Sequence, residues 1–145
     1  MSTSPREDAE PVLPTLFLDR SLGRLIVARG LRAAGVDVVT LAEHYGVPAD
    51  EQVSDVDWLH ECGRHGWAAL KADANIRRRT GPERVALVEA RVQTFVINGQ
   101  LTAEQKVERV LANLPAIARA CAVAGPFVYR VHLGQLQRLT IPPTT

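Results

Sequence analysis

Short apolar runs alternate with segments of helical spacing along this chain, and this rhythm constrains the fold more than any other feature. The run at residues 36–41 is almost continuously apolar, which is typical of a strand covered on both faces. Strands of this kind, joined by helices, form a parallel sheet between helical layers. We therefore predict an α/β fold with a central parallel sheet of about four to five strands and helices on both faces. The predicted strands cover residues 16–18, 36–41, 67–71, 92–98 and 127–131.

Helix start signals fill the intervals between the apolar runs. Ser21 and Ser54 stand where N-cap residues are expected, and Pro82 opens a further helical segment. Thr102 and Gln105 form a capping box, so we predict one long helix after them. Residues 43–53 and the end of the chain are predicted to be irregular. The predicted helices cover residues 22–34, 55–64, 82–90 and 102–122.

The length and composition are those of one ordinary globular domain. A chain of 145 residues can bury one core but not two, and 46% hydrophobic and 23% charged residues is a common balance. We predict a flexible tail over residues 1–14 and a domain over residues 15–140. The tail has no apolar run typical of a signal peptide, and no stretch reaches the roughly 18 apolar residues of a membrane span. We therefore expect a cytoplasmic protein without membrane contact.

Two aspartates come shortly after predicted strands. Asp19 follows the first strand and Asp73 follows the third. Open parallel sheets bind ligands at the carboxyl ends of their strands, so both side chains are expected in one crevice. Carboxylates are preferred ligands of Mg²⁺ and Mn²⁺, and such ions assist the cleavage of phosphodiester bonds. The alternative is that each aspartate caps a helix or forms a turn.

Asp57 and Glu43 are weaker candidates from position alone. Ser54 and Asp57 have capping-box spacing, and the helix dipole favours an acid in the first turn, so a capping role for Asp57 is favoured. Asp55 has the same explanation and is expected to point elsewhere on the helix. Glu43 lies in the segment after the second strand, from which its carboxylate could reach the crevice.

Charge is distributed unevenly along the chain. Residues 15–73 hold nine acidic and six basic side chains, a balance of −3, whereas residues 74–145 hold four acidic and ten basic ones, a balance of +6. Arg77, Arg78 and Arg79 follow Asp73 closely, and arginines bind phosphate strongly without reading base sequence. We predict phosphate contacts there, although an exposed charged loop would explain the cluster equally well.

The sequence motifs of several other kinds of active site are absent. No Gly-rich phosphate loop follows a strand, no Cys and His residues have zinc spacing, and no serine-hydrolase elbow is present. Cys62 and Cys121 stand among apolar residues at helical spacing, so we expect both to be reduced packing residues. The carboxylates are therefore the main candidates for chemistry.

Four motifs occur in order along the chain. They are Leu18-Asp19-Arg20-Ser21-Leu22-Gly23, Glu43-His44-Tyr45, Ser54-Asp55-Val56-Asp57-Trp58-Leu59 and Asp73-Ala74-Asn75-Ile76-Arg77. As a set, they resemble a PIN-like family related to the VapC-type toxins of bacterial toxin–antitoxin pairs. The likeness runs from about residue 15 to residue 133 and includes Gly125-Pro126-Phe127 before the last predicted strand.

The resemblance implies a PIN-like fold and cleavage of RNA that depends on Mg²⁺ or Mn²⁺. Matched position by position, it implies that Asp19, Asp57 and Asp73 hold the metal and are catalytic, with Glu43 in support. It also implies that a small antitoxin blocks the site and that homodimers are common. The expected function is therefore that of a metal-dependent endoribonuclease, the toxin component of a type II toxin–antitoxin pair.

The chain departs from the family at one position. The family often has Lys directly before its third acid, where this chain has Ala72. Lys71 faces the same side of an extended strand as Asp73, so it is a candidate substitute and RNA contact. If Lys71 cannot substitute, the alternative is a catalytically weak or inactive PIN-like binding module. A phosphoacceptor domain is a more distant alternative, because it needs a lysine after the last strand and no Lys follows Lys106.

Overall fold

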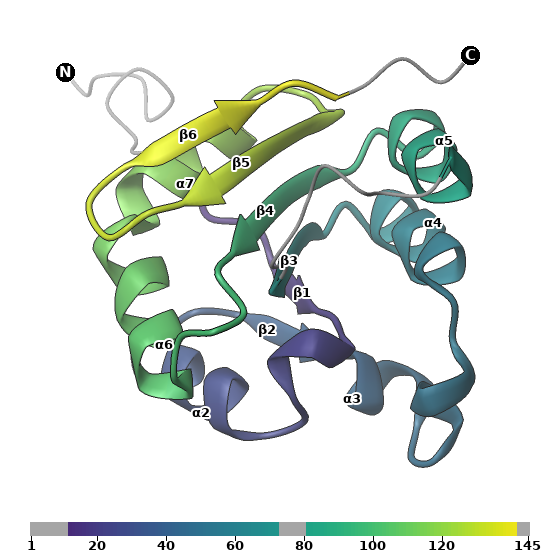
Figure 1. Ribbon diagram of the computed structural model, residues 1–145, viewed down its shortest axis with the longest axis horizontal. Coiled ribbons are helices and arrows are strands. Elements are labelled where there is room, and N and C mark those ends of the chain that lie inside the picture. Colours follow the sequence, from purple (N-terminus) through teal and green to yellow (C-terminus); the bar gives the residue numbers. More distant parts are fainter. Residues whose placement is uncertain (1–11, 73–80, 142–145) are drawn as a thin grey trace, which may run out of the picture.

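Six strands form one sheet in the computed structural model, which describes residues 12–72 and 81–141 (Figure 1). The strand order is β2-β1-β3-β4-β5-β6, and the pairs are parallel up to β5, which pairs antiparallel with β6. The predicted central parallel sheet is confirmed. Its strands are β1 (Leu16–Leu18), β2 (Val38–Thr40), β3 (Ala68–Ala72), β4 (Gln93–Ile97), β5 (Phe127–Val131) and β6 (Leu136–Leu139).

Helices cover both faces of the sheet, as predicted. Helices α2, α6 and α7 lie on one side of it, and α4 and α5 lie on the other (Figure 1). Within the described residues, no helix is long and apolar enough to cross a membrane. The helices are η1 (Arg20–Leu22), α2 (Ile26–Ala33), α3 (Leu41–Tyr45), η2 (Ala49–Gln52), α4 (Asp55–His65), α5 (Gly81–Glu89), α6 (Ala103–Ala112) and α7 (Leu114–Cys121).

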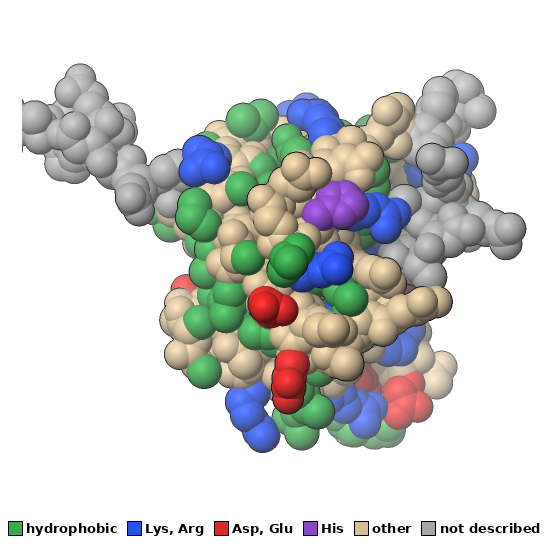
Figure 2. All heavy atoms as spheres, turned by 60° about the vertical axis from the view of Figure 1, so that its left-hand side comes forward, with side chains coloured by type: hydrophobic (Ala, Val, Ile, Leu, Met, Phe, Trp, Pro, Cys, Tyr) green, Lys and Arg blue, Asp and Glu red, His purple; other side chains and the backbone are tan. Residues whose placement is uncertain are grey.

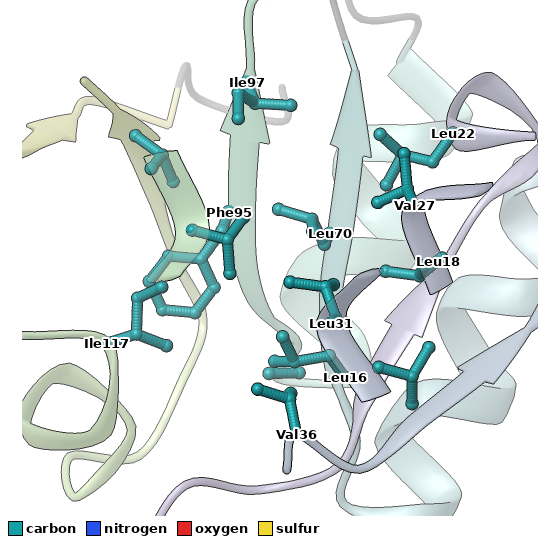
Figure 3. Packing of buried hydrophobic residues seen from close by; sticks show 14 of the residues in the cluster. Leu16, Leu18, Leu22, Val27, Leu31, Val36, Leu70, Phe95, Ile97 and Ile117 are labelled. Atoms are coloured by element: carbon teal, nitrogen blue, oxygen red, sulfur yellow. The ribbon is translucent and has the colours of Figure 1, made fainter. Parts of the chain in front are cut away.

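Alternate side chains of the strands supply two hydrophobic cores. In β1, Leu16 and Leu18 are buried in the cluster beside α2, whereas Phe17 between them is buried in the cluster beside α4. The same alternation in β3 directs Leu70 to the first cluster and Ala69 to the second. Figure 3 shows the first cluster, where side chains of β1, β3 and β4 meet those of α2 and α7. Both faces of these central parallel strands are therefore buried, as their apolar runs predict.

The prediction of four to five strands misses β6. This strand returns antiparallel to β5, with Val131 opposite Leu136. Its sequence carries Gln137 and Arg138 as exposed residues between two half-buried leucines. Such a short strand at the edge of the sheet has no alternating apolar pattern, because exposed Gln137 and Arg138 point to opposite faces. The end of the chain is therefore less irregular than predicted.

The single helix predicted over residues 102–122 is two helices, α6 and α7. Pro115 stands in the first turn of α7, where its missing N–H is tolerated, but it could not lie inside a continuous helix. The buried Asn113 side chain donates to the carbonyl oxygens of Arg109 at 2.8 Å and of His132 at 2.7 Å. These bonds attach the junction between the helices to the end of β5.

The segment predicted to be irregular contains the short helices α3 and η2. Thr40 and Glu43 form a capping box at the start of α3, each side chain accepting the other residue's N–H at 3.0 Å. The helix predicted over residues 22–34 likewise begins only at Ile26, after the one-turn η1. Most of the predicted N-terminal tail, residues 1–11, lies outside the described residues.

Candidate functional site

Asp19 lies at the carboxyl end of a central strand. β1 lies between β2 and β3, and the chain leaves β1 after Leu18. The Asp19 N–H donates to the carbonyl oxygen of Leu70 at 3.2 Å, so the backbone still follows β3 at this point. Asp19 is only 5% exposed. A buried carboxylate at this edge has the position from which parallel sheets bind ligands.

Ser21 connects the Asp19 carboxylate to the end of β3. The Ser21 N–H donates to Oδ1 of Asp19 at 2.8 Å, and the Ser21 hydroxyl makes a short hydrogen bond to the same oxygen. The same hydroxyl accepts the N–H of Ala72 at 2.9 Å. Asp19 is thus the N-cap of η1, and Ser21, predicted only to cap a helix, holds the carboxylate in place.

Burial has the largest effect on the ionisation of Asp19. It raises the pKa of this carboxyl, because the charged form loses its hydration. The hydrogen bonds from Ser21 and the charge of Lys71 lower the pKa, and the charge of Asp55 raises it, but burial prevails. Among the described residues, the negative charge is therefore only partly compensated. A divalent cation with a preference for oxygen ligands fits this arrangement.

Lys71, Asp55 and Trp58 form a connected group between β3 and α4. Nζ of Lys71 lies 3.7 Å from Oδ2 of Asp55, and Nε1 of Trp58 donates to Oδ1 of Asp55 at 2.9 Å. The Lys71 ammonium also lies 5.8 Å from the centre of the Trp58 ring. Lys71 is 8% exposed, and a buried ammonium requires such partners. The ammonium is thereby held where its charge acts on Asp19.

Of the two acids in the first turn of α4, Asp55 is half-buried near Lys71 and acts on Asp19, whereas Asp57 is exposed. Asp57 is exposed in the first turn of α4, and its N–H donates to the Ser54 hydroxyl at 3.1 Å. Its charge acts on Tyr45, whose pKa is raised to about 12, chiefly by burial. The charge from α4 that acts on Asp19 is that of Asp55. The expectation that Asp55 points elsewhere is therefore wrong, and sequence reasoning missed this residue.

Glu43 is engaged in contacts between structural elements. Its Oε1 lies 2.6 Å from a guanidinium nitrogen of Arg32 and also accepts the Thr40 N–H. The hydrogen bond from Arg32 lowers the pKa of Glu43. Arg32 donates in addition to the carbonyl oxygen of Val38 at 2.7 Å. These contacts join α2, β2 and α3, and they account for an acid at position 43 without a metal.

Four predicted site residues lie outside the described residues: Asp73, Arg77, Arg78 and Arg79. Their predicted roles as metal ligand and phosphate contacts stay predictions. Of the other predicted residues, the structure brings together Asp19 and Lys71, and it adds Asp55, Ser21 and Trp58 to them. This group, called the acidic pocket below, consists of those five residues.

Comparison with known proteins identifies relatives over most of the chain. The family described as "PIN like domain" matches residues 14–99. A protein of Mycobacterium tuberculosis named "Putative ribonuclease VapC45" is 39% identical over 127 residues, which cover 88% of this chain and 92% of that protein. No solved structure gives a significant match.

Proposed function

Because this chain belongs to the PIN-like domain family, we propose that it is a metal-dependent endoribonuclease that hydrolyses phosphodiester bonds of RNA. The observation that carries the proposal is the buried, incompletely compensated carboxylate of Asp19, next to Asp55 and Lys71. A purely structural acid at this place would be expected to have its charge satisfied by the protein. The ribonuclease name of the mycobacterial relative supports the same activity.

The proposed ligands of Mg²⁺ or Mn²⁺ are Asp19, Asp55 and Asp73. We place Asp55 in this set instead of Asp57 because Asp55 is half-buried, lies 3.7 Å from Lys71 and acts on the pKa of Asp19, whereas Asp57 is exposed. Asp73 follows directly in sequence on Ala72, the last residue of β3. When bound, the ion would activate water and neutralise charge on the phosphate.

The other residues of the acidic pocket would position these ligands. Ser21 fixes one oxygen of Asp19, and Trp58 fixes one oxygen of Asp55. Lys71 keeps a positive charge close to both carboxylates, and we propose that it replaces the lysine that the family has one position later. Its ammonium is also close enough to the carboxyl ends of the strands to attract an RNA phosphate.

The RNA would lie along the carboxyl ends of the strands. Arg77, Arg78 and Arg79, which follow Asp73 in sequence, are the proposed backbone contacts. Figure 2 shows the side formed by α6, α7 and the β5–β6 hairpin, where Lys and Arg side chains are scattered among hydrophobic and neutral ones. On the described part of this face they do not form one continuous patch, so it does not compete as a site for RNA.

We also propose the biological setting that the family resemblance implies. The protein would act in the cytoplasm as the toxin of a type II toxin–antitoxin pair, and a small antitoxin would be its partner. A homodimer is an additional proposal that follows from the same resemblance. Purification together with the product of a neighbouring small gene, followed by mass measurement of the complex, tests both proposals.

RNA cleavage by matched aspartate variants tests the enzymatic proposal. With Mg²⁺ or Mn²⁺, Asp19→Asn and Asp55→Asn should each lower the rate at least about 100-fold, because even partners of metal ligands commonly contribute 10- to 100-fold. Asp57→Asn, on the same helix, should keep the rate within about threefold.

Two results would contradict this assignment in different ways. Equal rates for the wild type and Asp19→Asn would remove Asp19 from the reaction. Loss of activity in Asp57→Asn alone would restore Asp57 as the ligand from α4. If the wild type neither cleaves RNA nor gives a heat of Mn²⁺ binding, the chain is instead the inactive binding module that its Ala72 suggests.

A further inference from the structure

Three side chains from α3 and α4 converge away from the acidic pocket. Nε2 of His44 lies 2.6 Å from Oε2 of Glu61, and Nε2 of His65 lies 3.5 Å from that same oxygen. Among the described residues, these three side chains form the group of possible metal ligands whose donor atoms all lie within 4.8 Å of one another. His44 and His65 are far apart in sequence, so only the fold brings them together.

Aromatic packing fixes the orientation of both imidazoles. The His65 ring stacks on Trp67, with centroids 4.2 Å apart and an interplanar angle of 10°. The His44 ring meets Trp67 edge-on, with centroids 5.1 Å apart and an angle of 88°. Phe17 in turn stacks on the other rings of this core, including Trp67 at 5.5 Å. Packing therefore holds both Nε2 atoms facing Oε2 of Glu61.

The two carboxylate oxygens of Glu61 have different partners. Its Oε1 lies 3.2 Å from the guanidinium of Arg64, whereas its Oε2 faces the two histidines. The hydrogen bond from His44 lowers the pKa of Glu61, so the carboxylate is held in its charged form. A carboxylate oxygen and two imidazole nitrogens, which would give up any proton on binding, form a set of three protein ligands for a metal ion that keeps one open position.

The cluster is separate from the acidic pocket. Glu61 and His65 lie six and ten residues after Asp55 on the same helix, which places them about 9 Å and 15 Å farther along its axis. Helix α4 starts beside the carboxyl ends of the strands and ends just before β3 begins. The cluster therefore lies towards the amino ends of the strands. The nuclease proposal therefore makes no use of these residues.

We propose that His44, Glu61 and His65 bind a transition-metal ion of the zinc class. Imidazole suits Zn²⁺, Ni²⁺ and Cu²⁺, whereas Mg²⁺ prefers sites made of oxygen ligands only. Bonds of about 2.0–2.2 Å place tetrahedral ligand atoms roughly 3.4 Å apart, so small side-chain movements would close the present group around an ion. The fourth position would be taken by water. Such an ion would attach the five-residue α3 to the much longer α4.

Visible absorption of bound Co²⁺, used as a probe for Zn²⁺, tests the proposal on the full chain without a histidine tag. One Co²⁺ bound by the wild type should show the strong absorption of a four-coordinate site, and added Zn²⁺ should remove this signal. His65→Gln and His44→Gln should each lower the affinity at least about tenfold, because each removes one of three ligands. The matched control is His60→Gln, an exposed histidine on the same helix, which should bind like the wild type.

Asp19→Asn distinguishes this site from the acidic pocket. It should lower the rate of RNA cleavage at least about 100-fold but leave the strong four-coordinate Co²⁺ absorption unchanged. Absence of four-coordinate Co²⁺ in the wild type, equal affinity in His65→Gln and His60→Gln, or loss of the spectrum in Asp19→Asn would each overturn the proposal. His65 is 41% exposed in its side chain at the last position of α4, so His65→Gln is expected to fold, and circular dichroism verifies this.

Discussion

Folding removes the Asp19 carboxylate from water and compensates its charge only in part. Ser21 and Lys71 favour the charged form, but burial and Asp55 oppose it, and the pKa of Asp19 rises as a result. A buried charge that destabilises the folded protein in the absence of a ligand is typical of a binding site. At the scale of single residues, the proposed function of Asp19 therefore opposes its contribution to stability.

Asp19→Asn should make the metal-free protein more stable at neutral pH. Below the ordinary Asp pKa of about 3.9, the carboxyl is protonated in both the folded and the unfolded chain, and no penalty arises. As the pH rises through that value towards the raised pKa of the folded state, the unfolded chain ionises first and the wild type loses stability. Asparagine avoids this loss and can still accept the hydrogen bonds of Ser21.

Urea unfolding between pH 3.5 and pH 7.5, with EDTA present, measures this effect. The free energies of unfolding of the wild type and Asp19→Asn should diverge as the pH rises and converge below about pH 4. The exposed Asp57→Asn variant should show no such divergence. A variant that is less stable than the wild type at pH 7 would contradict the incomplete compensation of Asp19.

Sequence reasoning predicts Asp19 but cannot separate Asp55 from Asp57. An acid directly after a buried strand has few structural reasons to be there, and the strand order then places it at the edge of the sheet. Asp55 and Asp57, in contrast, share the first turn of one helix and point about 200° apart around its axis. The rotation of α4 depends on how Trp58 and Leu59 pack against the sheet, which the local sequence does not specify.

At the scale of elements, α4 positions residues of both proposed metal sites. Its first turn carries Asp55, and its second half carries Glu61 and His65. Its start and its end were predictable, because Ser54 is an N-cap and Gly66 takes the left-handed conformation, with φ of 72°, that ends helices. The break between α6 and α7 was not predicted. The capping box at Thr102 indicates only where α6 begins, and the break depends on Pro115, which stands in the first turn of α7.

Ser54→Ala should destabilise the protein and weaken metal binding. The Ser54 hydroxyl accepts the Asp57 N–H at 3.1 Å, and loss of such a cap costs about 1 kcal/mol. Because the first turn of α4 also carries Asp55, its fraying should lower Mn²⁺ affinity in calorimetry. Thr102→Ala is the control, because Thr102 caps α6 in the same way, at 3.1 Å from the Gln105 nitrogen. The control should cost similar stability in urea unfolding; equal loss of Mn²⁺ affinity in both variants would contradict the role of α4.

At the scale of the whole molecule, the sheet order places the strands of each half of the sequence side by side. Strands β2, β1 and β3 belong to the acidic half, and β4, β5 and β6 to the basic half. The order itself agrees with the predicted parallel fold, whereas β6 could not be predicted, because its pairing depends on β5 and not on a pattern of its own.

Removing the three arginines after Asp73 should weaken RNA binding and reduce its dependence on salt. Each phosphate contact contributes about 0.7 to the slope of log affinity against log salt for a single strand. Replacing Arg77, Arg78 and Arg79 by alanine should therefore lower that slope by about 2. Fluorescence anisotropy with labelled RNA in EDTA measures it without cleavage. Arg29→Ala, on the exposed side of α2 in the acidic half, should leave the slope unchanged; a similar fall there would contradict the localisation.

The double role of the Ser21 hydroxyl has a mechanical consequence. One oxygen atom touches both the acid that ends the first strand and the amide that ends its neighbour. If Asp19 moves to bind the proposed metal ion, the Ser21 hydroxyl should transmit this movement to the N–H of Ala72. The same hydroxyl oxygen therefore couples the position of the acid to that of the last residue of β3.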